Sequence, residues 1–255
     1  MSAAVDSPET TEDRFLGGRV TLVQPVRPAH RAGSDAVFLA ATVGGASGRA
    51  LDMGAGCGAV GLIAALRSPD LSVDLVDNDP LQLSCARQSM EKNARLAPRM
   101  RLLAADLLAT ERERTAAGLV RESYDLILSN PPYRQRARVQ TDAARLAAHT
   151  FSHEELDAWL RCAASLLKPY GTLTMIFAAD GLKLLLQLFE GRFGDARVLG
   201  LHPSENSAAE RILIQATKGR RAPPKLLPGL ILHHADGSYT DRAKAILSGR
   251  ASIEL

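Results

Sequence analysis

The strongest constraint on the fold is a short apolar run that ends in closely spaced glycines at residues 51–58, LDMGAGCG. This pattern is typical of a strand that turns sharply into a helix, here expected over Ala59–Leu66. The free N–H groups of such a helix start lie where nucleotides bind, at the carboxyl ends of parallel strands. The next β-like run, Leu71–Val76, is followed by Asp77, whose carboxylate can accept hydrogen bonds from both ribose hydroxyls. The pattern predicts a nucleotide-type cofactor.

Apolar runs alternate with helical patterns along the rest of the chain, which favours a parallel sheet covered on both faces. The last two expected strands follow each other without a long helix, as in an antiparallel hairpin at a sheet edge. We therefore predict an α/β, doubly wound, mostly parallel seven-stranded sheet with an antiparallel edge strand. Its strands are expected at Ala50–Met53, Leu71–Val76, Arg101–Ala105, Tyr124–Ser129, Thr172–Ala178, Arg197–His202 and Ile212–Thr217.

The predicted organisation has four parts. Residues 1–14 form a flexible polar tail, and residues 15–48 an N-terminal addition with one strand and one helix. Residues 49–218 form the core. Residues 219–255 form a C-terminal extension packed on the core, which begins with a proline-rich surface linker and contains another strand at Leu230–His233.

Composition excludes several classes of protein. The three cysteines, Cys57, Cys85 and Cys162, form no CxxC pair, so neither a disulfide framework nor a zinc site is expected, and we predict no metal. No stretch reaches the ~20 apolar residues of a membrane helix, and the N-terminus lacks the features of a signal peptide. A cytoplasmic protein without membrane contact is expected. The net charge of +3 is too small to indicate a nucleic-acid partner by itself.

The glycine turn fits two cofactors. Residues 56–61 match the GxGxxG pattern of nicotinamide- and flavin-binding oxidoreductases. Alternatively, Asp52, two residues before the first glycine, is placed to face the cationic end of S-adenosyl-L-methionine, and this register resembles the first motif of class I methyltransferases. A tight strand–helix turn that binds nothing is a third possibility.

The segment 129–133, SNPPY, discriminates between these cofactors. Pro131 and Pro132 make a stiff turn after a strand, at the edge where the cofactor is expected. The Asn130 side-chain oxygen and the Pro131 carbonyl can accept the two hydrogens of a flat amino group and favour the positive charge that grows on its nitrogen during attack. Tyr133 offers a ring face for stacking. We therefore interpret Asn130 to Tyr133 as catalytic; a merely stiffened loop is the alternative.

The glycine turn and the NPPY segment together resemble the class I methyltransferases that modify planar nitrogens, which have a Rossmann-like fold. The resemblance is closer to the bacterial tRNA1(Val) adenine-37 N6-methyltransferase group. Flanking stretches also carry it, at residues 16–19, 24–25, 30–40, 211–216 and 234–240.

This resemblance implies roles for individual residues. It implies that Asp52, Gly54 and Gly56 line the methionine end of the cofactor, and that Asp77 binds its ribose. Asp106 would accept from the adenine amino group, although a simple helix N-cap is the alternative. Asn130 to Tyr133 would hold the target beside the cofactor. Arg31 and Asp35 would shape the cofactor mouth, or else form a local salt bridge.

Basic residues follow the NPPY segment and point to an RNA substrate. Residues 131–150 contain four arginines, the first three being Arg134, Arg136 and Arg138, and only one aspartate. A loop with this excess of positive charge can bind phosphates. A second basic cluster occupies residues 218–225. The leading hypothesis is an S-adenosylmethionine-dependent N-methyltransferase acting on adenine N6 in tRNA. The alternatives are methylation of a protein glutamine amide or a small molecule, an NAD- or FAD-dependent oxidoreductase, and a noncatalytic RNA-binding module.

Overall fold

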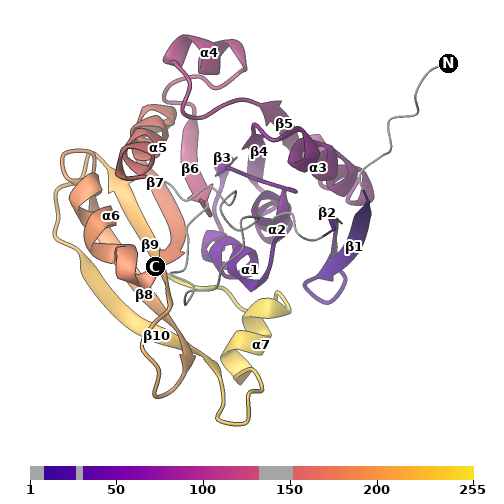
Figure 1. Cartoon of the computed structure of the whole chain (residues 1–255), viewed down its shortest axis with the longest axis vertical. Coiled ribbons are helices and arrows are strands. Elements are labelled where there is room, and N and C mark those ends of the chain that lie inside the picture. Colours follow the sequence, from indigo (N-terminus) through magenta and orange to yellow (C-terminus); the bar gives the residue numbers. More distant parts are fainter. Residues whose placement is uncertain (1–8, 27–30, 132–151) are drawn as a thin grey trace, which may run out of the picture.

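The computed structural model describes residues 9–26, 31–131 and 152–255, in which strands alternate with helices (Figure 1). Several helices begin where the sequence provides an N-cap: Asp79 accepts a hydrogen bond from Leu81 N, and Ser152 forms a capping box with Glu155. The helices are α1 (Ser34–Ala40), α2 (Ala59–Arg67), α3 (Pro80–Lys92), α4 (Glu111–Ala116), α5 (His153–Leu166), α6 (Leu182–Phe189) and α7 (Asp241–Leu247).

The large sheet has eight strands in the order β10-β8-β9-β7-β6-β3-β4-β5 within the described residues. Only β9 among them runs antiparallel to its neighbours. The predicted α/β, doubly wound, mostly parallel architecture is therefore confirmed. The strands are β3 (Gly48–Met53), β4 (Leu71–Asp77), β5 (Met100–Ala104), β6 (Tyr124–Ser129), β7 (Leu167–Ala178), β8 (Phe193–Ser204), β9 (Arg211–Lys218) and β10 (Lys225–His233).

Two details of the predicted sheet are wrong. The antiparallel strand β9 does not lie at the edge, because it inserts between β7 and β8 and pairs with both. The sheet has eight strands rather than seven, because β10 starts inside the expected linker and pairs in parallel with β8. β10 thereby covers the edge of β8, which would otherwise expose unpaired N–H and C=O groups.

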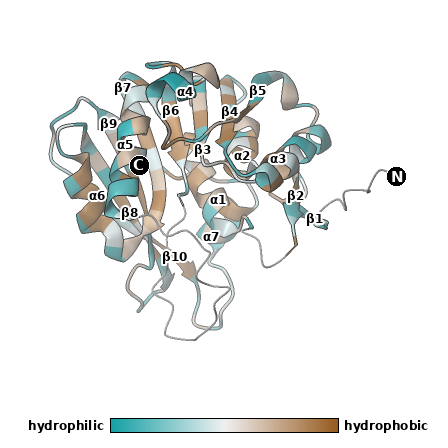
Figure 2. Ribbon diagram, turned by 45° about the horizontal axis from the view of Figure 1, so that its top comes forward, coloured by the Kyte–Doolittle hydropathy of each residue, from teal (hydrophilic) through white to brown (hydrophobic). Residues whose placement is uncertain are grey.

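Both faces of the sheet are buried under helices. Alternating residues of the central strands point to opposite faces, so Ala50 packs in the cluster that contains α1 and α2, whereas Leu51 and Met53 pack in the cluster that contains α5 and α6. Figure 2 shows the hydrophobic residues gathered along these central strands. The carboxyl edge of the parallel strands is consequently the part of the sheet where polar groups can meet a ligand.

A small hairpin precedes the core. Its strands β1 (Thr10–Phe15) and β2 (Val20–Pro25) pair antiparallel, so residues 10–14 belong to a strand and not to the expected tail. The hairpin is anchored on α3, because Ser89 Oγ accepts from Val23 N at 2.9 Å and Asn93 Nδ2 donates to Thr21 O at 2.7 Å. Residues 10–14 are polar, and pairing with β2 is enough to place them in a strand.

The C-terminal residues pack back onto the first helices of the core. Arg67 at the end of α2 donates to the carbonyls of Ile246 and Ala251, and Ile253 N donates to Ala41 O at 2.9 Å. The extension therefore closes the sheet with β10 and covers α1 and α2 with α7 and the segment after it. Within the three described ranges, no helix is long and apolar enough to cross a bilayer.

Candidate active site at the carboxyl edge of the sheet

The strand register brings the predicted site residues to one edge. Met53 lies opposite both Val76 of β4 and Ser129 of β6, so the glycine turn, Asp77 and Asn130 follow three neighbouring strand ends. Neighbouring strands lie about 4.8 Å apart, so Asn130 and the glycine turn lie close together. The register thus brings together the two segments that the sequence predicts to bind the cofactor and the target.

The glycine turn needs its glycines for conformational reasons. Gly54, Gly56 and Gly58 all have positive φ, at +77°, +54° and +85°. A Cβ on Gly54 would lie 2.9 Å from Cη2 of Trp159, which packs over the turn. A side chain at Gly54 is therefore excluded both by backbone conformation and by space.

Asp52 lies beneath the turn, with a side chain that is 1% exposed. Its Oδ2 accepts from Gly61 N at 2.7 Å, and a Cβ on Gly61 would lie 2.1 Å from Cδ2 of Leu75, so any larger residue there would displace the Leu75 side chain. Its Oδ1 is buried and has no hydrogen-bond partner among the described residues. Burial, together with the nearby charge of Asp77, raises the pKa of Asp52 to about 7, against the opposing effect of the Gly61 N–H.

Asp77 is tied to the glycine turn and to its own loop. Its Oδ2 accepts from Gly56 N at 2.8 Å, and its Oδ1 accepts from the N–H groups of Asn78 and Asp79, both at 2.9 Å. A carboxylate has about four acceptor sites, so one remains for a ligand hydroxyl. The side chain stands at the carboxyl end of β4, as the sequence predicts.

Asp106 follows β5 at the same edge and is exposed. Its Oδ1 accepts from Leu108 N at 2.9 Å and so closes a turn. The N-cap of α4 is Thr110 instead, so the alternative of Asp106 as a helix N-cap is wrong. Asp106 is one of the residues that line a pocket of about 350 Å³, together with residues of α4.

The segment that the sequence predicts to be catalytic, residues 130–133, is described only at its start. Asn130 is partly exposed and Pro131 is buried directly after β6. Pro132 and Tyr133, and the arginines Arg134, Arg136 and Arg138, lie outside the described residues.

Trp159 of α5 also belongs to this site, although the sequence alone assigns it no role toward a ligand. Its Nε1–H donates to Ser129 Oγ at 3.1 Å, and Ser129 Oγ donates to Met53 O at 3.1 Å. This chain joins α5 to the ends of β6 and β3, directly beside Asn130 and Gly54. The available signal was that the single tryptophan of the chain has a polar N–H on an apolar face, which needs a partner when buried.

We expect Trp159→Phe to lower the rate of methyl transfer about tenfold while the protein stays folded. The ring is retained, but Ser129 Oγ loses its donor and the end of β6 is less firmly held. A measurement of kcat together with the melting temperature checks this. An unchanged kcat would show that the Trp159–Ser129 hydrogen bond does not orient Asn130.

Arg31 and Asp35 do not form the local salt bridge that the sequence allowed as an alternative. Arg31 binds Asp13 of β1, whereas Asp35 at the start of α1 lies 3.2 Å from Arg211 Nε. Arg211 begins β9 opposite Ala178, the last residue of β7, so Asp35 does lie at the carboxyl edge. The sequence could not reveal this pair, since its members are 176 positions apart.

The second basic cluster lies at the opposite edge of the sheet. Lys218 ends the antiparallel strand β9 opposite Phe193, the first residue of β8, and its Nζ contacts Glu122 and the Leu167 carbonyl. Lys225 begins β10 and pairs with Asp195. Both of these lysines are paired, and they lie at the amino edge of the parallel strands, opposite the edge that carries Asn130, so they do not extend the candidate site.

Comparisons with known proteins agree with this geometry. The methyltransferase small domain family matches residues 32–199. A tRNA1(Val) (adenine(37)-N6)-methyltransferase of Porphyromonas gingivalis is 31% identical over 228 residues, which cover 83% of this chain and 85% of the relative. A predicted O-methyltransferase of Agrobacterium tumefaciens has a similar structure, with a TM-score of 0.75, 28% identity, and coverage of 87% of this chain and 99% of that one.

A more distant structure shares the fold. The Thermus thermophilus 16S rRNA N2 G1207 methyltransferase, solved with AdoMet and guanosine, has a TM-score of 0.55 and 23% identity, over 82% of this chain and 50% of that one.

Proposed function

Because the chain belongs to the methyltransferase small domain family, we propose that it transfers a methyl group from S-adenosylmethionine to an adenine N6 amino group in tRNA. The single observation that carries the proposal is the position of Asn130 at the end of β6, beside the glycine turn that follows β3. An amide oxygen at this place is an acceptor for a flat NH₂ group. The Porphyromonas relative, matched over most of both chains, supports adenine in tRNA as the substrate.

The residues at the carboxyl edge fit S-adenosylmethionine. The buried Asp52 Oδ1 without a partner suits a cationic ligand group, because a carboxylate oxygen in a low-dielectric site favours an opposite charge. Asp77 retains an acceptor site for a ribose hydroxyl. We propose that Asp52, Gly54 and Gly56 hold the methionine end, that Asp77 holds the ribose, and that Asp106 lies toward the adenine. Asp35 would border the mouth of the cleft.

The chemistry needs orientation more than it needs a base. The bound cofactor supplies an electrophilic methyl group on a sulfonium. Asn130 Oδ1 and the Pro131 carbonyl accept the two N–H groups of the target, which turns the nitrogen lone pair toward the methyl carbon. Both acceptors stabilise the positive charge that develops on the target nitrogen as the C–N bond forms and the methyl–sulfur bond breaks, with the electron pair of the broken bond staying on the departing thioether sulfur. The amino proton then leaves to solvent. Reactants oriented in this way can react as if one of them were present at an effective concentration of roughly 10⁵ to 10⁸ M.

Cofactor affinity is expected to depend on pH through Asp52. Its pKa of about 7 means that the carboxyl is mostly protonated at pH 6 and mostly ionised at pH 8. Only the ionised form attracts a cation, so we expect the affinity for S-adenosylmethionine to fall about tenfold from pH 8 to pH 6. Calorimetry across this range checks it, with Asp52→Asn as control, because the variant lacks the titrating group. Parallel pH profiles for the two proteins would contradict the role of Asp52.

The substrate is tested with RNA from cells that lack the protein. The purified chain is incubated with this RNA and methyl-labelled S-adenosylmethionine, and the tRNA is then digested to nucleosides. We expect label in N6-methyladenosine. A parallel assay uses a release factor in place of RNA. Label in a glutamine of that protein would show that the substrate is a side-chain amide and not adenine. Binding of RNA without incorporation of label would favour a noncatalytic RNA-binding module, and affinity for NAD or FAD instead of S-adenosylmethionine would favour an oxidoreductase.

A further inference from the structure

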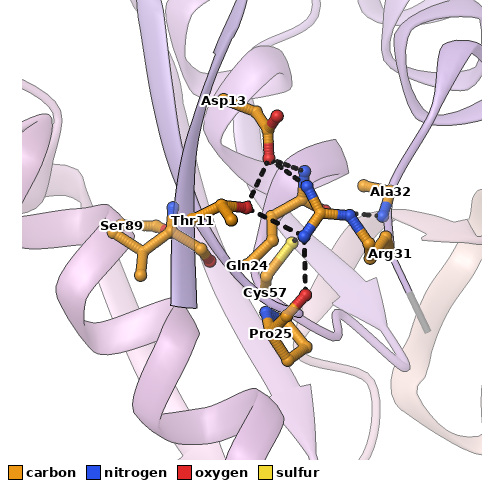
Figure 3. A network of polar contacts seen from close by, with 9 residues as sticks. Thr11, Asp13, Gln24, Pro25, Arg31, Ala32, Cys57 and Ser89 are labelled. Atoms are coloured by element: carbon orange, nitrogen blue, oxygen red, sulfur yellow. Dashed lines mark hydrogen bonds and ion pairs between the residues drawn. The ribbon is translucent and has the colours of Figure 1, made fainter. Parts of the chain in front are cut away.

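A buried amide at the end of β2 connects the front hairpin to the glycine turn (Figure 3). The Gln24 side chain is 1% exposed and contacts three separate parts of the chain. Its Oε1 accepts from Ala32 N at 2.7 Å and from the Cys57 thiol at 3.6 Å, and its Nε2 donates to Asp13 Oδ2 at 2.9 Å. Cys57 lies within the glycine turn, between Gly56 and Gly58.

The hydrogen-bond pattern determines which way this amide points. Its oxygen meets two donors and its nitrogen meets a carboxylate, so a flipped amide would oppose two donors at Ala32 and two acceptors at Asp13. Burial raises the pKa of the Cys57 thiol to about 12, so the thiol keeps its proton and acts as the donor. The oxygen and the nitrogen of the Gln24 amide therefore both have hydrogen-bond partners in one orientation only.

Arg31 completes the network from the outside. It donates to Asp13 Oδ2, to Thr11 Oγ1 at 2.8 Å and to Pro25 O at 2.6 Å, and so joins β1, the end of β2 and the segment that leads into α1. The same segment carries Ala32, whose N–H binds Gln24. Asp13 is thereby held where it receives the Gln24 amide.

We propose that Gln24 is a positioning residue for cofactor binding: it holds the glycine turn through Cys57 and the start of α1 through Ala32 at a constant spacing. The inference rests on the proposed function, since it concerns the glycine turn on which S-adenosylmethionine would bind. Gln24 does not touch the reacting atoms; it acts through the backbone of the turn, where small displacements of a binding group weaken a ligand strongly. On this inference the hairpin supports the proposed cofactor site.

The test separates positioning from general stability with two variants of the hairpin. Gln24→Met keeps the length of the side chain and removes its three hydrogen bonds. Ser89→Ala is the matched control, because it weakens the anchoring of the same strand on α3 without touching Gln24. Calorimetry gives the Kd for S-adenosylmethionine, and assays at saturating cofactor give kcat.

We expect Gln24→Met to raise this Kd about tenfold with kcat within about twofold of the unaltered protein. Ser89→Ala should lower the melting temperature and leave the Kd unchanged. An unchanged Kd in Gln24→Met, or an equal rise in Ser89→Ala, overturns the inference and leaves the proposed function intact. If the unaltered chain binds no S-adenosylmethionine, both fail. If Gln24→Met does not fold, Asp13→Ala decides by the same measurement, because it removes the acceptor of the amide from a partly exposed position.

Discussion

The Asn130→Ala protein is expected to bind S-adenosylmethionine normally and to transfer methyl groups at least about 10²- to 10³-fold more slowly. Asn130 lies at the carboxyl end of β6, where its side-chain oxygen can accept from the target amino group. Loss of one preorganised acceptor at a site of developing charge lowers kcat by about 10² to 10³. Loss of target orientation adds to this effect. Calorimetry with the cofactor and single-turnover methylation of tRNA measure the two properties separately.

The control for this variant is Asn206→Ala, at an exposed asparagine that follows β8 at the same edge of the sheet. It should leave both cofactor affinity and methyl transfer unchanged. If Asn130→Ala lost cofactor binding and methylation together, Asn130 would be a structural residue of the cleft. If it kept full activity, the proposed grip on the amino group would be wrong.

The second large effect is expected at Asp77. Its carboxylate accepts from Gly56 N and from two N–H groups of its own loop, and the proposal adds a ribose hydroxyl. Asp77→Asn keeps the shape but turns an NH₂ group toward donors. Hydrogen bonds to charged groups contribute about 1.5–3 kcal/mol each, so we expect the Kd for S-adenosylmethionine to rise about 10- to 100-fold, with a smaller effect on kcat.

Asp79→Asn is the matched control for Asp77→Asn. Asp79 lies two residues further on and caps α3 by accepting from Leu81 N, a role that asparagine fulfils equally well. Its Kd should stay close to that of the unaltered protein. Equal losses of affinity in both variants would indicate that the loop tolerates no change, and would argue against a specific contact from Asp77.

The site was predictable where its signals are local. The glycine turn, Asp77 and Asn130 each directly follow an apolar run, and parallel strands that end together bring such residues to one edge. The same logic placed Asp106 at that edge, although it closes a turn there and does not cap a helix. The roles of these residues in binding the cofactor and the target stay predictions, because the position of a residue at a strand end does not specify which ligand atom it contacts.

The remaining features depend on contacts between distant residues. The position of β9 inside the sheet follows from its pairing with both β7 and β8. The eighth strand, β10, forms because residues that the sequence predicts as a linker pair with β8. Trp159 reaches Ser129 from another element, and Gln24 reaches Cys57 across 33 positions. Hydrophobic periodicity carries no information on such pairings, because it reports only which face of an element is buried.

A crystal structure with S-adenosylhomocysteine tests the central claim most directly, because that claim is geometric. The account predicts that the sulfur lies between the glycine turn and Asn130, with the ribose on Asp77 and the amino group of the ligand toward Asp52. A ligand bound with its sulfur away from the end of β6 would contradict it, since no methyl group could then reach an amine held by Asn130.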